Sequence, residues 1–133
     1  MKKSLVTSLF AILLLVTTGA YASEGGEGGG GGGLYAKLGT FTVNLQNISE
    51  YLQIDVSVKM PNPGMLEAVK TYLPFIKHEL ILLLSSQDSK QLASVAGKQK
   101  LMEETKAVVN KVLKLDPKDG ITDVLFESFV IQQ

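Results

Sequence analysis

The sequence contains no cysteine, no arginine and only one histidine. Disulfides are therefore excluded, and the cysteine count cannot report the compartment. All 13 basic residues are lysines, whereas nucleic-acid-binding proteins usually draw on arginine for bidentate contacts with bases and phosphates. His78 has no cysteine or second histidine with which to form a metal site, and it is best interpreted as a surface residue. These absences disfavour nucleic-acid partners and metal sites.

Catalytic patterns are missing as well. A nucleophilic serine needs a base and a turn such as G-x-S-x-G, and neither accompanies the pair Ser85-Ser86. No two carboxylates sit in apolar surroundings that would separate their roles as acid and base. The stretch from Asp116 to Asp123 resembles a sparse calcium loop, but Pro117 and the lack of a bidentate glutamate spoil the pattern. We therefore predict no catalytic residue, no metal and no cofactor, and interpret the protein as non-enzymatic.

Residues 1–22 have the three-part plan of a secretory signal peptide. Met1-Lys2-Lys3 is a positive start, the run from Leu5 to Val16 is mostly apolar, and Ala20-Tyr21-Ala22 is an A-x-A pattern. We expect cleavage after Ala22. The alternative is an uncleaved signal anchor, for which this segment is of marginal length. In both cases the body of the protein lies outside the cytoplasm.

Residues 23–33 read SEGGEGGGGGG. This composition predicts a flexible tether, because glycine offers no side chain to pack and maximal backbone freedom. A phosphate-binding glycine loop would instead need a strand before it and a helix after it, and neither is present. The remaining residues, 34–133, form a single domain of about 100 residues, large enough to bury a core.

Three segments of this domain have the two-residue periodicity of strands. Phe41, Val43 and Leu45 alternate with polar residues, and Gly39 allows a bulge in this first strand, which we place at 35–45. The second strand, 51–60, is the clearest, and the short polar link before it predicts an antiparallel hairpin. The last strand, 121–132, is apolar on both faces, so we expect it in a buried or central position.

Two segments have helical periodicity. The first runs from Pro63 to Ser86, with Pro74 expected to kink it, and its buried stripe is predicted to pass through Leu80 and Leu83. The second runs from Gly97 to Leu115, with Val108 and Val112 expected on its buried stripe. The order strand, strand, helix, helix, strand predicts an α+β fold: a small three-stranded sheet with helices packed on one face.

The end of the first helix, Leu80–Leu84, is apolar all round. Leu80 continues the buried stripe, whereas Ile81 and Leu84 point away from it and need another neighbour. That neighbour is either the second helix or another subunit. With Phe75 on the flank of the stripe, Ile81 and Leu84 are the candidate interaction surface.

Three stretches together resemble the flagellar basal body-associated FliL family. They are the start of the domain, the second strand, and the ends of the first helix and last strand, with the motifs YAKL and FTVNL (35–45), YLQIDV (51–56), LLLSS (82–86) and FVIQ (129–132). The resemblance covers residues 35–132. It implies an N-terminal membrane segment, a linker and a periplasmic domain similar to the ring-forming domains of stomatin-type proteins.

The resemblance also implies a function. We expect a structural or accessory protein of the flagellar basal body that forms a homo-oligomeric ring around the motor stator and supports rotation, motility and chemotaxis. Its partners would be further copies of itself, the stator proteins and the basal body. The domain would be periplasmic, either released by cleavage or held by a single inner-membrane anchor. A small-ligand-binding or adaptor module of the periplasm, unrelated to the motor, is the alternative, but the sequence offers no polar cluster for a ligand.

A first prediction concerns the N-terminus. If residues 1–22 are a cleavable signal peptide, the intact mass of the protein from the cell envelope corresponds to a chain that begins at Ser23. Recovery of Met1 in a membrane pellet that resists carbonate washing would show the anchor instead.

Overall fold

The structure, a computed structural model, describes residues 34–133. The expected signal segment, its cleavage after Ala22 and the glycine tether therefore lie outside the described residues. In chain order the elements are β1 (Leu34–Asn44), β2 (Tyr51–Met60), α1 (Met65–Thr71), α2 (Leu73–Ser85), α3 (Ser89–Leu92), α4 (Val95–Leu113) and β3 (Asp123–Gln132).

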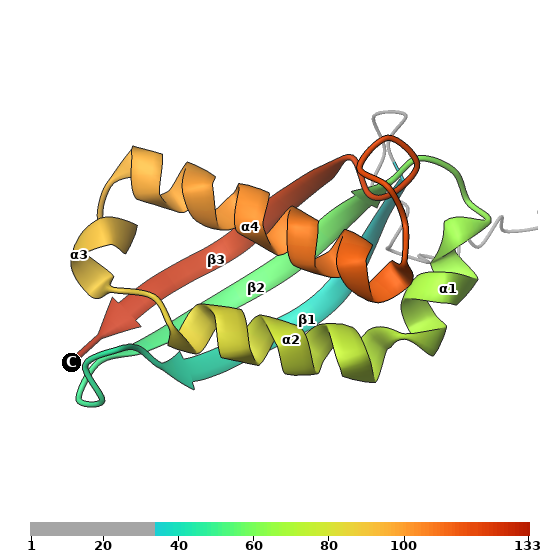
Figure 1. The fold of residues 1–133 in the computed structure, drawn as a ribbon. Coiled ribbons are helices and arrows are strands. Elements are labelled where there is room, and N and C mark those ends of the chain that lie inside the picture. Colours follow the sequence, from blue (N-terminus) through green and yellow to red (C-terminus); the bar gives the residue numbers. More distant parts are fainter. Residues whose placement is uncertain (1–33) are drawn as a thin grey trace, which may run out of the picture.

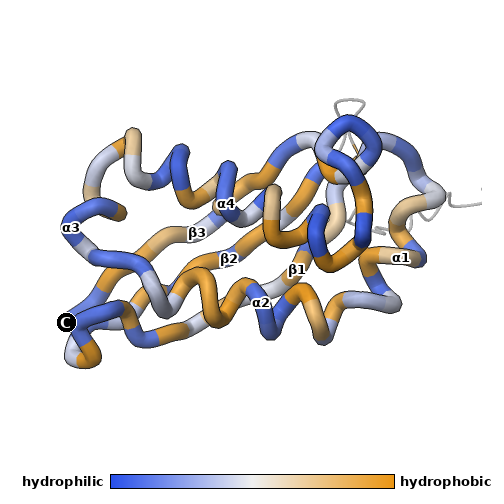
Figure 2. The backbone as a smooth tube through the Cα atoms, in the orientation of Figure 1, coloured by the Kyte–Doolittle hydropathy of each residue, from blue (hydrophilic) through white to orange (hydrophobic). Residues whose placement is uncertain are grey.

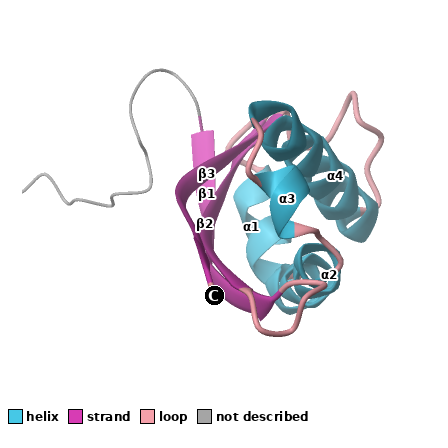
Figure 3. Cartoon of the chain, turned by 90° about the vertical axis from the view of Figure 1, so that its left-hand side faces the viewer, coloured by secondary structure: helices cyan, strands magenta, loops and turns pink. Residues whose placement is uncertain are grey.

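The three strands form one antiparallel sheet in the order β1-β2-β3 (Figure 1). The helices lie together on one face of it, and none of the described elements covers the opposite face (Figure 3). Helix α2 packs against β1 and α4, and α4 packs against β3. The predicted α+β fold, with helices on one face of a small sheet, is confirmed.

The central strand β2 contributes its alternate side chains to the core. Its alternation works as predicted, since Leu52, Ile54, Val56 and Val58 are all buried beneath the helices. Strand β1 pairs with β2 as the predicted hairpin. An extra residue in β1, Leu38, makes the expected bulge, and the φ of +116° at Gly39 is one that glycine adopts without strain.

The expectation of a central position for β3 is wrong: β3 is an edge strand. Its apolar residues on both faces have a different cause. A second bulge leaves Glu127 without a partner in β2, so the alternation shifts by one residue there. Phe126 and Phe129, three apart, therefore both pack against the core, while Leu125 and Val130 remain partly exposed on the outer face.

The first predicted helix is broken rather than kinked. Helix α1 ends at Thr71, Tyr72 leaves helical geometry, and α2 begins at Leu73 with Pro74 in its first turn. A proline there costs no hydrogen bond, because the first amides of a helix have no partner within it. Pro74 therefore starts a second helix instead of bending one long helix.

Helices α2 and α4 each turn one side, made of buried residues, towards the sheet. Helix α2 buries Ile76, Leu80 and Leu84, a stripe displaced from the predicted one through Leu83, which is half-buried. Helix α4 buries Leu101, Thr105, Val109, Asn110 and Leu113, whereas Val108 and Val112, expected on its buried stripe, are only half-buried. Helix α2 is the more hydrophobic of the two along its length (Figure 2).

Asn110 fixes the entry into β3. Its Oδ1 accepts a hydrogen bond from the backbone N of Ile121 at 2.7 Å, and its Nδ2 donates to the carbonyl oxygen of Ile121 at 3.5 Å. Gly120 must be glycine for this contact, because a Cβ at that position would lie 2.0 Å from Asn110 Oδ1. The turn after α4 is therefore held to the helix by one buried side chain.

We expect Asn110→Ala to lower the melting temperature. The substitution leaves the buried amide of Ile121 unpaired, at a cost of about 1–3 kcal/mol. For a domain of this size the midpoint should fall by at least about 4 °C in a thermal melt followed by circular dichroism. Gln99→Ala, at an exposed position of the same helix, is the control and should melt like the parent. Equal midpoints for the two variants would contradict the role of Asn110.

Candidate functional site

The part of the chain that the structure describes offers little for chemistry. Among residues 34–133, no three or more His, Cys, Asp or Glu side chains gather in a way that could hold a metal ion. None of the helices formed by these residues has the length and apolar character needed to cross a membrane. His78 is exposed on α2, where the sequence analysis placed it.

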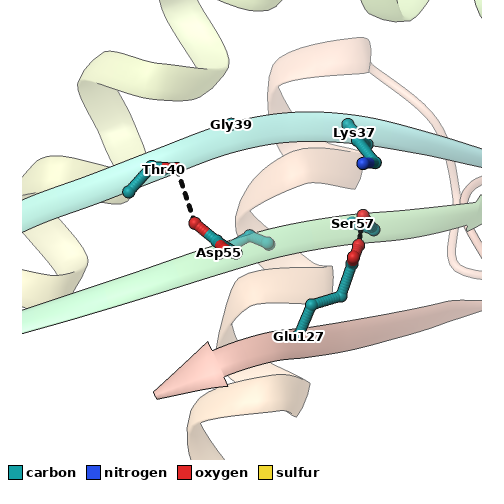
Figure 4. A pocket seen from close by; sticks show the side chains of 7 residues that line it. Lys37, Gly39, Thr40, Asp55, Ser57 and Glu127 are labelled. Atoms are coloured by element: carbon teal, nitrogen blue, oxygen red, sulfur yellow. Dashed lines mark hydrogen bonds between the residues drawn. The ribbon is translucent and has the colours of Figure 1, made fainter. Parts of the chain in front are cut away.

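A polar cluster lies on the outer face of the sheet, where the bulges of β1 and β3 flank the same part of β2 (Figure 4). Thr40 Oγ1 donates to Asp55 Oδ1 at 2.5 Å, which links β1 to β2, and the hydroxyl of Ser57 donates to Glu127, which links β2 to β3. Both hydroxyls are thus committed to carboxylates, and the hollow beside them holds only about 120 Å³. We interpret the cluster as a tie between the three strands where they bend.

Exposed apolar side chains distinguish the helical layer. Phe75 is 63% exposed and Ile81 is 45% exposed, so both lie on the surface as the sequence analysis expected. The expectation for Leu84 is wrong, because Leu84 is 1% exposed and part of the core. Its position four residues after Leu80 places it on the buried stripe of α2.

Phe75 and Ile81 do not form one patch. At 100° per residue, six residues along a helix correspond to about 120° around its axis, so the two lie on opposite flanks of α2. Leu82, seven residues after Phe75, lies on the same side as Phe75 and is 55% exposed. The exposure of Leu82 was not predicted, although its seven-residue spacing from Phe75 is visible in the sequence.

An apolar groove runs between α2 and α4. It has a volume of about 400 Å³. Its lining consists of Tyr72 just before α2, Phe75 and Glu79 of α2, and Val108, Lys111, Val112 and Lys114 of α4 and its cap. The rings of Tyr72 and Phe75 lie with their centroids 6.4 Å apart, so the aromatic wall is formed by side chains that contact one another. The groove is therefore apolar on its walls, with two lysines and one glutamate around it.

Lys114 reaches this groove from an unusual backbone conformation. Its φ of 58° and ψ of 42° are left-handed, and among residues 34–133 it is the one residue other than glycine with a positive φ. The conformation closes α4, since the next amide, Leu115 N, donates to the carbonyl oxygen of Asn110 at 2.9 Å. Glycine usually occupies such a position, and a side chain there costs about 1–2 kcal/mol.

The domain matches a known family over nearly all of its described length. The family model is that of the flagellar basal body-associated protein FliL, and it matches residues 35–132. The chain belongs to the FliL family. The resemblance seen in the strand and helix motifs is thereby confirmed.

Curated members of the FliL family from distant bacteria are similar to this chain. The flagellar protein FliL of Escherichia coli strain K12 is 33% identical over 100 residues, which are 74% of this chain and 65% of that protein. The flagellar protein FliL of Aquifex aeolicus is 29% identical over 94 residues, which are 69% of this chain and 56% of that protein. The match therefore spans just under two thirds of the length of the first relative and just over half that of the second.

A charge on the exposed flank of α2 can be compared with a charge on its buried stripe. Because Ile81 is exposed, Ile81→Lys should leave this FliL domain folded, with a melting temperature close to that of the parent. Leu84→Lys should unfold it, because an unpaired buried charge costs several kcal/mol against a total stability of about 5–15 kcal/mol. Circular dichroism melts of both variants give the comparison. Loss of folding in Ile81→Lys would place this flank in the core and remove it from the interaction surface.

Proposed function

We propose that this FliL-family chain is a non-enzymatic accessory protein of the flagellar basal body. In this proposal its domain forms a homo-oligomeric ring around the motor stator and supports rotation, and through it motility and chemotaxis. Its partners are further copies of itself, the stator proteins and the basal body. Membership of the family supports the basal body as the place of action.

The observation that carries self-association is the exposed apolar surface of α2. Phe75 and Leu82 are each more than half exposed on one side of the helix, and Phe75 also lines the groove between α2 and α4. Apolar surface of this kind is stabilised when a partner covers it.

The sheet edges favour helices over strands as the contact. Strand β1 and strand β3 are both free edges, and each carries a bulge that interrupts its ladder. Bulged edges pair poorly with strands of another chain, because the unpaired residue displaces the donors and acceptors that follow it. We therefore assign self-association to side-chain contacts in which the helical layer supplies one surface, rather than to an added strand.

The N-terminal segment decides how the domain is held. We propose a periplasmic domain that is either released by cleavage after Ala22 or held by a single inner-membrane anchor, with residues 23–33 as the tether in both cases. An anchor would keep copies of the domain at one height above the membrane, which favours a planar ring over a random aggregate.

The alternative is a periplasmic module that binds a small ligand. The groove between α2 and α4 favours it, because its volume of about 400 Å³ lies within the usual range of ligand sites. A ligand module would be monomeric before and after its groove residues are changed, whereas a ring component would fall from an oligomer to a smaller species.

We expect the purified full chain to sediment as an oligomer, and the double variant Phe75→Ser with Leu82→Ser to sediment as a monomer. Both side chains are exposed, so their truncation removes contact surface without opening the core. Cells that carry the double variant should swim more slowly, most clearly in viscous medium. His78→Ala is the control and should swim like the parent. A parent chain that is monomeric alone and with stator periplasmic segments would refute the proposal.

A further inference from the structure

The turn between β1 and β2 carries an isolated apolar side chain. Ile48 is 81% exposed at the tip of the hairpin, the highest value among the large exposed hydrophobic residues of the described domain. Short polar links usually avoid such a residue, because an isoleucine in water gains nothing from the turn itself.

Hydrogen bonds hold this tip in one conformation. Asn44 Nδ2 donates to the carbonyl oxygen of Ile48 at 2.8 Å, and Asn47 Oδ1 accepts from the backbone N of Ser49 at 3.1 Å and from its hydroxyl at 2.8 Å. Two backbone bonds of 2.9 Å, from Leu45 N to Glu50 O and from Glu50 N to Asn47 O, close the turn. Ile48 is thus presented on a pre-organised support, which lowers the entropy lost when it binds.

The tip and the groove lie at opposite ends of the domain (Figure 1). Gln46 ties the hairpin to the end of α2, because its backbone N donates to the carbonyl oxygen of Gln87 at 3.0 Å and its Nε2 to that of Ser86 at 2.9 Å. The groove begins at Tyr72 and Phe75, at the start of α2. The eleven residues from Phe75 to Ser86 correspond to about 16 Å of helix, so the tip cannot reach the groove of its own chain.

The two surfaces are complementary in polarity and in charge. The tip offers one branched aliphatic side chain, and the groove offers aromatic and valine walls. Glu50 is the one charged residue of the turn, whereas two lysines, Lys111 and Lys114, outnumber Glu79 in the groove. A carboxylate beside the tip and a groove with net positive charge attract each other when copies meet head to tail.

We propose that Ile48 of one copy inserts into the groove between α2 and α4 of the next copy. The inference rests on the self-association proposed above and specifies its surfaces. Because each copy contributes a different surface to the joint, the contact is heterologous and leads to a ring when the rotation between copies closes. One side chain in a groove is a small interface, so a single joint is weak, and closure, in which every copy makes two joints, stabilises the assembly.

The absence of native cysteine makes a direct test possible in cells. In the full chain, the double variant Ile48→Cys with Phe75→Cys should form a ladder of disulfide-linked oligomers under mild oxidation. Ile48→Cys alone should give few dimers, because tips do not meet in a head-to-tail contact. Coexpression of the two single variants should give dimers and nothing larger, since each chain then carries one reactive end.

Val95 supplies the matched control. It is 72% exposed and lies outside the hairpin, so Val95→Cys with Phe75→Cys should give no ladder. Dimers of Ile48→Cys alone would overturn the proposal in favour of a symmetric contact between tips. No ladder from the first pair, in a parent chain that still sediments as an oligomer, would overturn this joint and leave the proposed function standing. A monomeric parent chain would overturn both.

Lys114→Gly separates the effect of charge in the groove on self-association from any effect on the stability of the fold. Glycine suits the left-handed backbone at this position, so the variant should melt at the same or a higher temperature than the parent. It also removes one positive charge from the groove, so oligomers of the full chain should dissociate at a protein concentration several-fold higher. Unchanged dissociation would show that the charge of Lys114 takes no part in the joint.

Discussion

The structure depends on the need to cover one face of a three-stranded sheet. Four alternating residues of β2, Leu52, Ile54, Val56 and Val58, are almost completely removed from water, and they share one core with buried residues of all four helices. Helix α2 turns a single stripe of buried residues, Ile76, Leu80 and Leu84, towards the sheet. The remaining flanks of α2 stay in solvent whatever residues they carry. The apolar residues found there, Phe75 above all, are therefore not explained by the fold and are available for contact with a partner.

Much of the fold follows from residue periodicity. Strand β2 begins and ends where its alternation does, and the hairpin with β1 follows from the short polar link. Periodicity fails to predict the faces of a strand where a bulge inserts an extra residue. The unpaired Glu127 shifts the faces of β3, and only pairing with β2, a partner far away in the sequence, makes this visible. Pro74 was ambiguous in a different way, because a proline within a periodic segment fits a kink or a new first turn equally well.

The candidate surface was only partly visible in the sequence. Exposure of Phe75 and Ile81 follows from their distance from the stripe, but the error at Leu84 shows that a shift of one residue in the stripe exchanges core for surface. The groove could not be predicted, because Val108 and Val112 were assigned to the core by their helical spacing. They line a groove because α4 packs against both β3 and α2, and this arrangement is a property of tertiary packing.

The pairing of β2 with β3 has a consequence for the folding of the newly made chain. The hydrogen bond between Ser57 and Glu127 joins residues that are 70 apart in the sequence, and the whole ladder between these strands spans similar separations. Closing such a loop precedes any gain from the contacts that it allows, so this half of the sheet forms slowly compared with the hairpin. Of the three strands, the one that completes the sheet, β3, is also the last to be synthesised. Before β3 has been made and paired, the helices can cover the inner face of β2 but not the backbone groups along its unpaired edge. That edge is then the part of the sheet most able to pair with a strand of another chain.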